Sequence, residues 1–298
     1  MSSDQTLANS PSVSRTVETP GPYAWSRRTF LVACMGSVGG TLAGCHLASK
    51  KEVGLPARHS LRADQLVVLS DFKLPSKHPL IEDLVKLRTQ VSKALQLPLK
   101  TEDVVVYLFS DELAYHQYIQ TAHPGLPSRR AYFIATPKEL AVYTYWGDRI
   151  QEDLRHEYTH GLLHACLQSV PLWFDEGLAE YFEVAGEKPG GIQPDYAHRL
   201  TRGIQNGWRP DLERLEKLEK TEQMQRADYR EAWAWVHFLN HSSPETRQIM
   251  LDYLRELQSN TNPEPLSKRL DREIPAFEDR FLSYLAGLNT FRHGVGSS

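Results

Sequence analysis

The chain has 298 residues, of which 41% are hydrophobic and 24% are charged, so it is long enough for one compact domain or two closely packed subdomains. Its formal net charge is −3 and its Lys and Arg residues form no cluster, which argues against a nucleic-acid-binding protein. It has three cysteines, too few for a disulfide-stabilised scaffold.

The first 44 residues contain the parts of an export signal in the expected order. Arg27 and Arg28 precede a short apolar run that ends in Leu42-Ala43-Gly44-Cys45. A paired arginine before such a run is typical of a twin-arginine signal, and the final tetrapeptide resembles a lipoprotein signal-peptidase box. The run is too short and too rich in glycine to span a bilayer stably, so we expect no retained membrane helix.

These signals predict how the chain is processed and where it is located. We expect removal of residues 1–44, acylation of Cys45 and a tether over 45–60, so that the exported protein is anchored to a membrane of the cell envelope and faces the periplasm or the exterior. The alternative is a cytoplasmic protein whose disordered N-terminus contains an incidental arginine pair. Cys166 would be the remaining free thiol, and we expect it to be a small buried core residue, not a metal ligand.

We expect residues 61–290 to form one domain. Its first part, 61–147, is expected to contain both strands and helices. Runs of β-branched and aromatic residues predict the strands, and apolar residues at helical spacing predict the helices. Strands are expected at 65–69, 103–109, 131–135 and 140–146, and helices at 79–97 and 110–119. We expect Ser110 to be the N-cap of the second helix, and the last two strands to pair antiparallel.

The second part, 148–290, predicts helices only. They are expected at 149–168, 174–184, 196–206, 211–219, 229–240, 244–258 and 275–288. The predicted fold class is therefore α+β, with an N-terminal α/β subdomain that contains a small mixed sheet, followed by an all-helical subdomain.

The most informative motif is His156-Glu157-Tyr158-Thr159-His160, which lies on the helix expected at 149–168. Two histidines four residues apart lie one turn from each other on one helix face, close enough to bind a single metal ion. Glu157 could then take a proton from a water molecule at that ion, as hydrolysis requires. The alternative is a pair of hydrogen-bonded polar histidines on an amphipathic helix.

A second block, residues 173–181, supplies three carboxylates: Asp175, Glu176 and Glu180. Any one of them could complete a site with two imidazoles, one carboxylate and an open position, which is a donor set that suits Zn²⁺. His164 continues the row of histidines, but it lies about 12 Å along the helix from His156 and cannot bind the same ion. We expect His164 to be structural.

Together, the segments HEYTH and WFDEGLAEY resemble the gluzincin metallopeptidases, the superfamily of thermolysin and aminopeptidase N, and especially small bacterial relatives with a peptidase MA-like domain. The family pattern is His-Glu-x-x-His, followed by Glu-Gly-x-Ala after an aromatic residue and Asp or Asn. The resemblance covers residues 103–253. It implies a thermolysin-like catalytic domain with the zinc site at the seam between the α/β part and the helical part.

The resemblance also assigns roles in the metal site. It implies that His156, His160 and Glu176 bind one zinc ion per chain and that Glu157 is the general base. It makes Glu180 the carboxylate that orients the first histidine, which is a common outer partner of a metal-bound imidazole. The alternative for this last residue is an ordinary surface charge.

The resemblance further implies an oxyanion-stabilising group. Tyr229, at the start of a predicted helix, is similar to the tyrosine that has this role in aminopeptidase-type members. The alternative is a tyrosine that only packs at the helix start, and His198 and His237 are weaker candidates for the role.

One departure from the aminopeptidases narrows the expected activity. Their Gly-x-Met-Glu-Asn segment, whose glutamate binds the substrate's amino group, has no counterpart between Pro127 and Asp148, which favours an endopeptidase. The strand at 140–146 could be an edge strand that pairs with an extended substrate. We expect a zinc endopeptidase of the cell envelope whose partners are a peptide or protein substrate and the membrane. The alternative is a non-catalytic zinc-binding scaffold lipoprotein.

Overall fold

The computed structural model describes residues 54–98, 102–260 and 262–288. The predicted export signal, the acylated Cys45 and most of the predicted tether lie outside these residues. Within the described part of the chain, no helix combines the length and the hydropathy that crossing a membrane requires.

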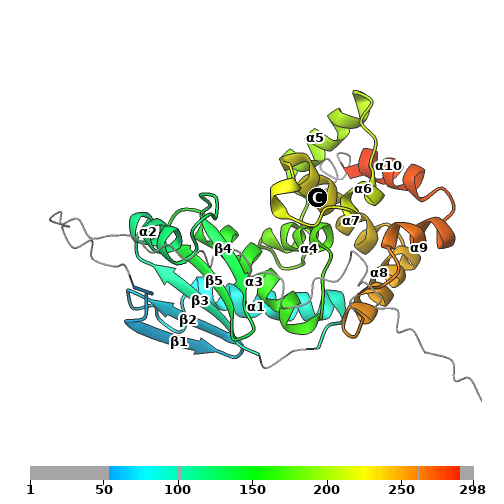
Figure 1. The fold of residues 1–298 in the computed structure, drawn as a ribbon. Helices are drawn as coiled ribbons and strands as arrows, with labels where there is room; N and C mark the ends of the chain where they lie inside the picture. The colour runs from blue at the N-terminus through cyan, green and yellow to red at the C-terminus, as the bar shows by residue number, and fades with distance from the viewer. Residues whose placement is uncertain (1–53, 99–101, 261, 289–298) are drawn as a thin grey trace, which may run out of the picture.

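A five-stranded mixed sheet forms the N-terminal part of the fold (Figure 1). Its order is β1-β2-β3-β5-β4, with β2, β3 and β5 parallel and the two outer strands antiparallel. The strands are β1 (His59–Ala63), β2 (Leu66–Ser70), β3 (Val104–Phe109), β4 (Ala131–Ala135) and β5 (Leu140–Tyr145). The predicted antiparallel pairing of the last two strands is confirmed, with Phe133 opposite Val142.

One sequence expectation about this sheet is wrong, and one strand was not predicted. The strand expected at 140–146 is not an edge strand, because β5 pairs with β3 on one side and with β4 on the other. The edge strand on this side is β4. The structure also has β1, which the sequence did not predict because it is short and its two apolar residues, Leu61 and Ala63, give too weak an alternating pattern.

Helices cover both faces of the sheet. Alternate residues of β3 point to opposite faces, so that Val104 and Val106 join the main core and Tyr107 joins a second cluster of aromatic residues. Helices α1 (Pro79–Leu95) and α3 (Ile150–Cys166) bury their apolar sides in the main core, and α2 (Glu112–Ala122) covers the aromatic cluster. The N-cap of α2 is Asp111, which accepts from the amide of Ala114, and not Ser110 as predicted.

The remainder of the described chain is helical, as predicted. The helices are α4 (Leu172–Glu183), α5 (Pro194–Gln205), α6 (Leu212–Glu216), the 3₁₀ turn η1 (Thr221–Gln223), α7 (Arg226–His241), α8 (Pro244–Leu257), α9 (Leu266–Glu273) and α10 (Phe277–Leu288). The short, highly charged α9 was not predicted. Helix α7 is the centre of this part, and its Trp235 stacks on Phe281 of α10 with ring centroids 3.6 Å apart.

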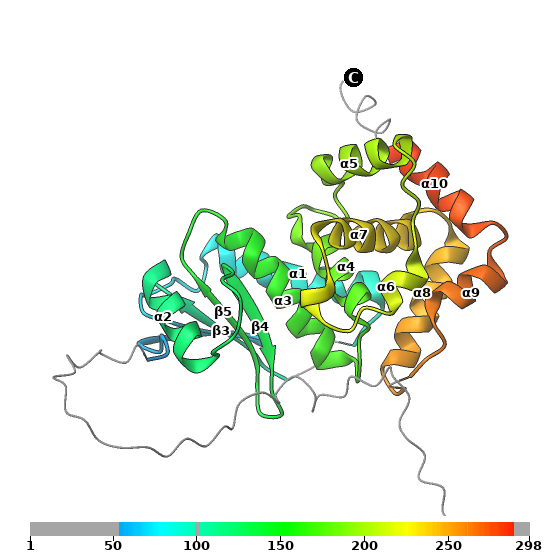
Figure 2. The same ribbon diagram turned by 45° about the horizontal axis from the view of Figure 1, so that its top comes forward.

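The two parts meet along α3 and α4. Figures 1 and 2 show the sheet and α2 on one side of α3, and the helices from α4 onward on the other. The predicted fold class is therefore confirmed in its general terms: an α+β protein with a small mixed sheet followed by helices.

Candidate metal centre

Helix α3 presents the two histidines of the first motif to α4. Its buried Leu154, Tyr158 and Leu162 belong to the core shared with the sheet. Gly161 lets α3 approach β3 closely, because a Cβ at this position would lie only 2.6 Å from Cγ1 of Val104. The opposite side of α3 faces α4, where the second motif lies.

The side chains of His156, His160 and Glu176 converge across this contact. Their ligand atoms all lie within 4.8 Å of one another. Oε2 of Glu176 lies 3.4 Å from Nε2 of His156 and 3.7 Å from Nε2 of His160. In a tetrahedral zinc site with bonds of 2.0–2.1 Å, neighbouring ligand atoms are about 3.4 Å apart. The three side chains therefore fit a zinc ion in both donor type and spacing.

The other nitrogen of each imidazole has a carboxylate partner. Nδ1 of His156 lies 3.1 Å from Glu183, and Nδ1 of His160 lies 2.9 Å from Asp175. The second contact is a close ion pair and not a well-aligned hydrogen bond. Such outer carboxylates orient metal-ligating histidines and fix which nitrogen faces the metal. Asp175 therefore contacts Nδ1 of His160, whereas Glu176 faces Nε2 of both histidines.

Glu180 and Glu183 both lie near His156, with ligand atoms of the three side chains within 4.8 Å of one another, but Glu183 makes the closer contact. The carboxylate on Nδ1 of His156 belongs to Glu183, at the end of α4, whereas Glu180 accepts a hydrogen bond of 2.9 Å from the hydroxyl of Tyr196 on α5. Burial raises the pKa of Glu180 to about 7. The rotation of α4 relative to α3 decides which of the two carboxylates meets the imidazole, and this rotation cannot be obtained from residue spacing.

A buried arginine holds the end of α4 in place. The guanidinium of Arg155, 1% exposed, pairs with Asp83 of α1 at 2.9 Å and donates to the carbonyls of Phe182 and Glu183, each at 3.0 Å. A cation at a helix C-terminus satisfies carbonyls that have no partner within the helix. Arg155 therefore fixes the backbone that carries Glu183.

The carboxylates and imidazoles of the centre stabilise each other's charged forms. Burial opposes charge on Glu176 and Asp175, but the neighbouring imidazoles outweigh it and lower the pKa of both carboxyls. Burial also opposes charge on His160, but Asp175 and Glu176 outweigh it and raise the pKa of this imidazole to about 9. Buried carboxylates that polarise imidazoles in this way also favour a bound cation.

Glu157 lies beside the ligand triad and remains partly accessible to solvent. Burial raises the pKa of its carboxyl, although the two imidazoles and the backbone amide of Phe133 on β4 act in the opposite direction. The ring of Phe133 stacks on His160 with a centroid distance of 6.0 Å. The edge strand β4 is therefore in direct contact with the metal centre.

Tyr229 reaches the same centre from the first turn of α7. Burial and the charge of Glu176 raise the pKa of its hydroxyl to about 12. The positive charge of Arg129, on the loop before β4, acts in the opposite direction. Sequence reasoning missed Arg129 because a single arginine in a loop has no pattern, and it missed Arg155 because helix periodicity does not identify a buried charge.

Close backbone packing sets the spacing between α4 and α7. A Cβ at Gly177 would lie 2.7 Å from the carbonyl oxygen of Ala232 and 2.9 Å from its carbonyl carbon. Gly177 directly follows Glu176, and Ala232 lies one turn after Tyr229. The glycine of the second motif is therefore required by helix packing.

The remaining predicted residues lie outside the ligand triad. His164 is structural, as expected, and contacts Asp175 at 2.9 Å. His237 is hydrogen-bonded to Tyr284 and to the carbonyl of Gly190. His198 lines a hollow on α5. Neither histidine belongs to the candidate metal centre.

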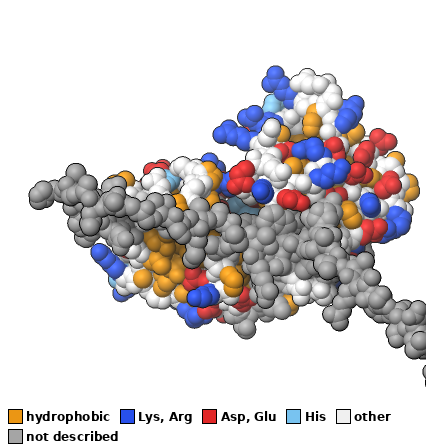
Figure 3. All heavy atoms as spheres, viewed as in Figure 1, with side chains coloured by type: hydrophobic (Ala, Val, Ile, Leu, Met, Phe, Trp, Pro, Cys, Tyr) orange, Lys and Arg blue, Asp and Glu red, His pale blue; other side chains and the backbone are white. Residues whose placement is uncertain are grey.

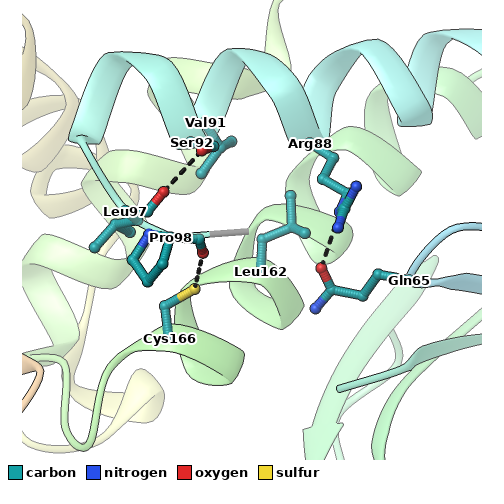
Figure 4. A pocket seen from close by; sticks show the side chains of 8 residues that line it. All are labelled: Gln65, Arg88, Val91, Ser92, Leu97, Pro98, Leu162 and Cys166. Atoms are coloured by element: carbon teal, nitrogen blue, oxygen red, sulfur yellow. Dashed lines mark hydrogen bonds between the residues drawn. The ribbon is translucent and has the colours of Figure 1, made fainter. Parts of the chain in front are cut away.

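Cys166 lies away from the metal centre, so it is not a ligand of this site. Its thiol donates to the carbonyl of Pro98 at 3.3 Å, beside a cavity of about 10 Å³ between α1 and α3 (Figure 4). It is half-buried and packs against the main core, so it is a core residue as expected, although it is more exposed than expected.

No protein-family model matches this chain, and no curated protein is similar enough to it to indicate a relationship. The case for a function therefore depends on the residues and geometry of the site.

Proposed function

We propose that this protein is a zinc-dependent peptidase with a gluzincin-type centre and a thermolysin-like arrangement of the metal helices. The observation that carries the proposal is the convergence of His156, His160 and Glu176 at the ligand spacing of tetrahedral zinc, with Glu157 beside them. A structural zinc site has four protein ligands, whereas this triad leaves one position open, as in catalytic zinc sites.

The chemistry is divided among side chains of this chain. A zinc ion on the triad would polarise a peptide carbonyl and make a water molecule more acidic. Glu157 accepts a proton from that water, and the raised pKa of its carboxyl suits it to return the proton to the leaving amine. Tyr229 donates a hydrogen bond to the oxygen of the scissile carbonyl as negative charge develops on it, and the positive charge of Arg129 favours that negative charge.

The edge strand gives the substrate a place to bind. Strand β4 pairs with β5 on one side only, and α3 packs next to it, so an extended peptide can add to its outer edge. A peptide bound there would pass Phe133 and Glu157 with its backbone held on both sides of the scissile bond. This arrangement favours an endopeptidase.

The variant Glu157→Gln tests the proposed mechanism. It removes a proton acceptor without removing a ligand, so it should keep one zinc per chain while kcat falls by several orders of magnitude, roughly 10³–10⁵. Turnover of a peptide and protein library is measured with and without a chelator, and zinc is counted by native mass spectrometry. Chelator-resistant cleavage, or wild-type turnover by Glu157→Gln, would contradict the proposal. If no library member is cleaved and the variant has no phenotype, the scaffold alternative is correct.

We also propose that the enzyme acts at the cell envelope, anchored by lipid on Cys45. The ordered arginine pair, apolar run and terminal tetrapeptide of residues 27–45 support this location. Cys45→Ala should move the protein from the membrane fraction to the soluble fraction, or leave the precursor uncleaved. Unchanged fractionation and processing would rule out the anchor.

A further inference from the structure

A hollow of about 480 Å³ between α5 and α7 is lined mainly by positively charged and polar side chains. Its lining residues are Asp195, His198, Arg199, Arg202, Gly203, Asn206 and Arg230. Figure 3 shows Lys and Arg side chains gathered over α5 on the face that it views. We call this hollow the basic pocket.

Two arginines of the basic pocket have no compensating charge. Asp195 is its single carboxylate, and it pairs with Arg199 one turn away at 2.6 Å. Across residues 54–98, 102–260 and 262–288, no carboxylate lies within ion-pair distance of Arg202 or Arg230. A guanidinium presents several donors in a plane and suits carboxylates. The pocket is therefore prepared for an anionic ligand.

Tyr196 connects α5, which carries most of the basic pocket, to the helices of the candidate metal centre. Arg230 directly follows Tyr229, and Tyr196 on α5 donates its hydroxyl to Glu180 of α4 while its ring packs against Trp233 of α7, with centroids 5.7 Å apart. A ligand in the pocket therefore contacts α7 one residue after the proposed oxyanion donor. Because the basic groups line a hollow, they suit an extended acidic segment better than a flat phospholipid surface.

We infer that the basic pocket binds an acidic stretch of the peptide substrate, held by Arg202 and Arg230, to one side of the scissile bond. This inference rests on the proposed peptidase function, because only a peptidase would have the bound peptide as its substrate. Binding of the peptide itself needs neither zinc nor turnover. It gives the enzyme a preference for peptides with several Asp or Glu residues near the cleavage site.

The test measures binding separately from catalysis. Fluorescein-labelled hexaglutamate and hexaglutamine are titrated by anisotropy into Glu157→Gln protein, with zinc and with chelator. The acidic peptide should bind in both conditions and the amide peptide should not. Arg202→Gln with Arg230→Gln should weaken hexaglutamate binding about tenfold, since two charge-assisted contacts are lost.

A control variant removes the same charge elsewhere. Arg255→Gln with Arg272→Gln changes two exposed arginines on α8 and α9 and should leave the affinity within about twofold, because long-range effects of exposed charges are screened by salt. Equal losses in the two double variants, or no binding of hexaglutamate to the parent protein, would overturn the inference. So would binding of phosphatidylglycerol vesicles that depends on Arg202 and Arg230 while hexaglutamate fails to bind. If the protein cleaves neutral peptides but does not bind hexaglutamate, the inferred role of the basic pocket is wrong and the proposed peptidase function still holds.

Discussion

Two pairs of histidines, each with a spacing of four residues, lie on two helices of this protein and have opposite electrostatic surroundings. His156 and His160 on α3 have ring centroids 5.0 Å apart, and His237 and His241 on α7 have centroids 4.5 Å apart. The first pair is bordered by carboxylates. The second is hydrogen-bonded to tyrosine hydroxyls, with a backbone carbonyl as a further partner of His237.

The surroundings determine the charge of each pair. Carboxylates outweigh burial and raise the pKa of His160, whereas burial and the neighbouring His241 lower the pKa of His237 to about 4. Helix spacing brings two imidazoles together in both places, but only the carboxylates of α4 make one pair suitable for a cation. Residue spacing alone therefore does not identify a metal site.

The largest expected effect is the loss of zinc from one pair only. Native mass spectrometry should find one zinc per chain in the wild type, none with His156→Ala and His160→Ala, and one with His237→Gln and His241→Gln. The reason is that only the first double variant removes ligands. Circular dichroism checks that each variant is folded. Full zinc content in the α3 double variant would mean that the ion, if any, binds elsewhere.

The next largest effect is a difference in kcat between two tyrosine variants, one at the start of α7 and one that contacts His237 near its end. Tyr229→Phe should lower kcat roughly 10²–10³-fold with little change in KM, because one donor to the developing oxyanion is removed. Tyr284→Phe removes the hydroxyl that contacts His237 and should leave kcat within about twofold. Steady-state kinetics on a cleaved peptide decide this. Equal losses of kcat in both variants would assign Tyr229 a packing role.

The smallest effect is a pH dependence of stability from the α7 pair. An unfolded histidine titrates near pH 6.5 and the buried His237 near 4, so between pH 7.5 and 5 the unfolded chain binds a proton that the folded chain does not. Stability is therefore lost as the pH falls, by about 2 kcal/mol from this residue. His241, whose pKa is also lowered by burial, contributes in the same direction.

The measurement uses urea unfolding in the His156→Ala, His160→Ala background, so that zinc release does not contribute. Adding His237→Gln should reduce the fall in unfolding free energy between pH 7.5 and 5. An unchanged fall would show that His237 is solvated or already protonated in the folded chain.

Sequence patterns that repeat locally predicted the local structure well. The strand at Ala131–Ala135 and the helix around the first motif follow from alternation and from helical spacing, which are properties of neighbouring residues. The same spacing brought His156 and His160 together, and the structure places Glu176 with them.

Features that depend on distant segments were not predictable. The sheet order makes β4 the edge strand, and no single segment encodes an order that depends on all five. The contact of His156 with Glu183 instead of Glu180 depends on how Arg155 holds the end of α4. The influence of Arg129 on Tyr229 comes from a loop before β4. These are properties of tertiary contacts between α3, α4 and α7.

The contact of Gly177 with Ala232 has a consequence for how this protein could vary. Because the two helix backbones touch there, the separation between Glu176 on α4 and Tyr229 on α7 does not depend on the size of any side chain between them. Substitutions elsewhere on this interface can alter stability while the distance between these two side chains stays constant. An added methyl at position 177 would do the reverse: every reactive group would remain, but at the wrong separation.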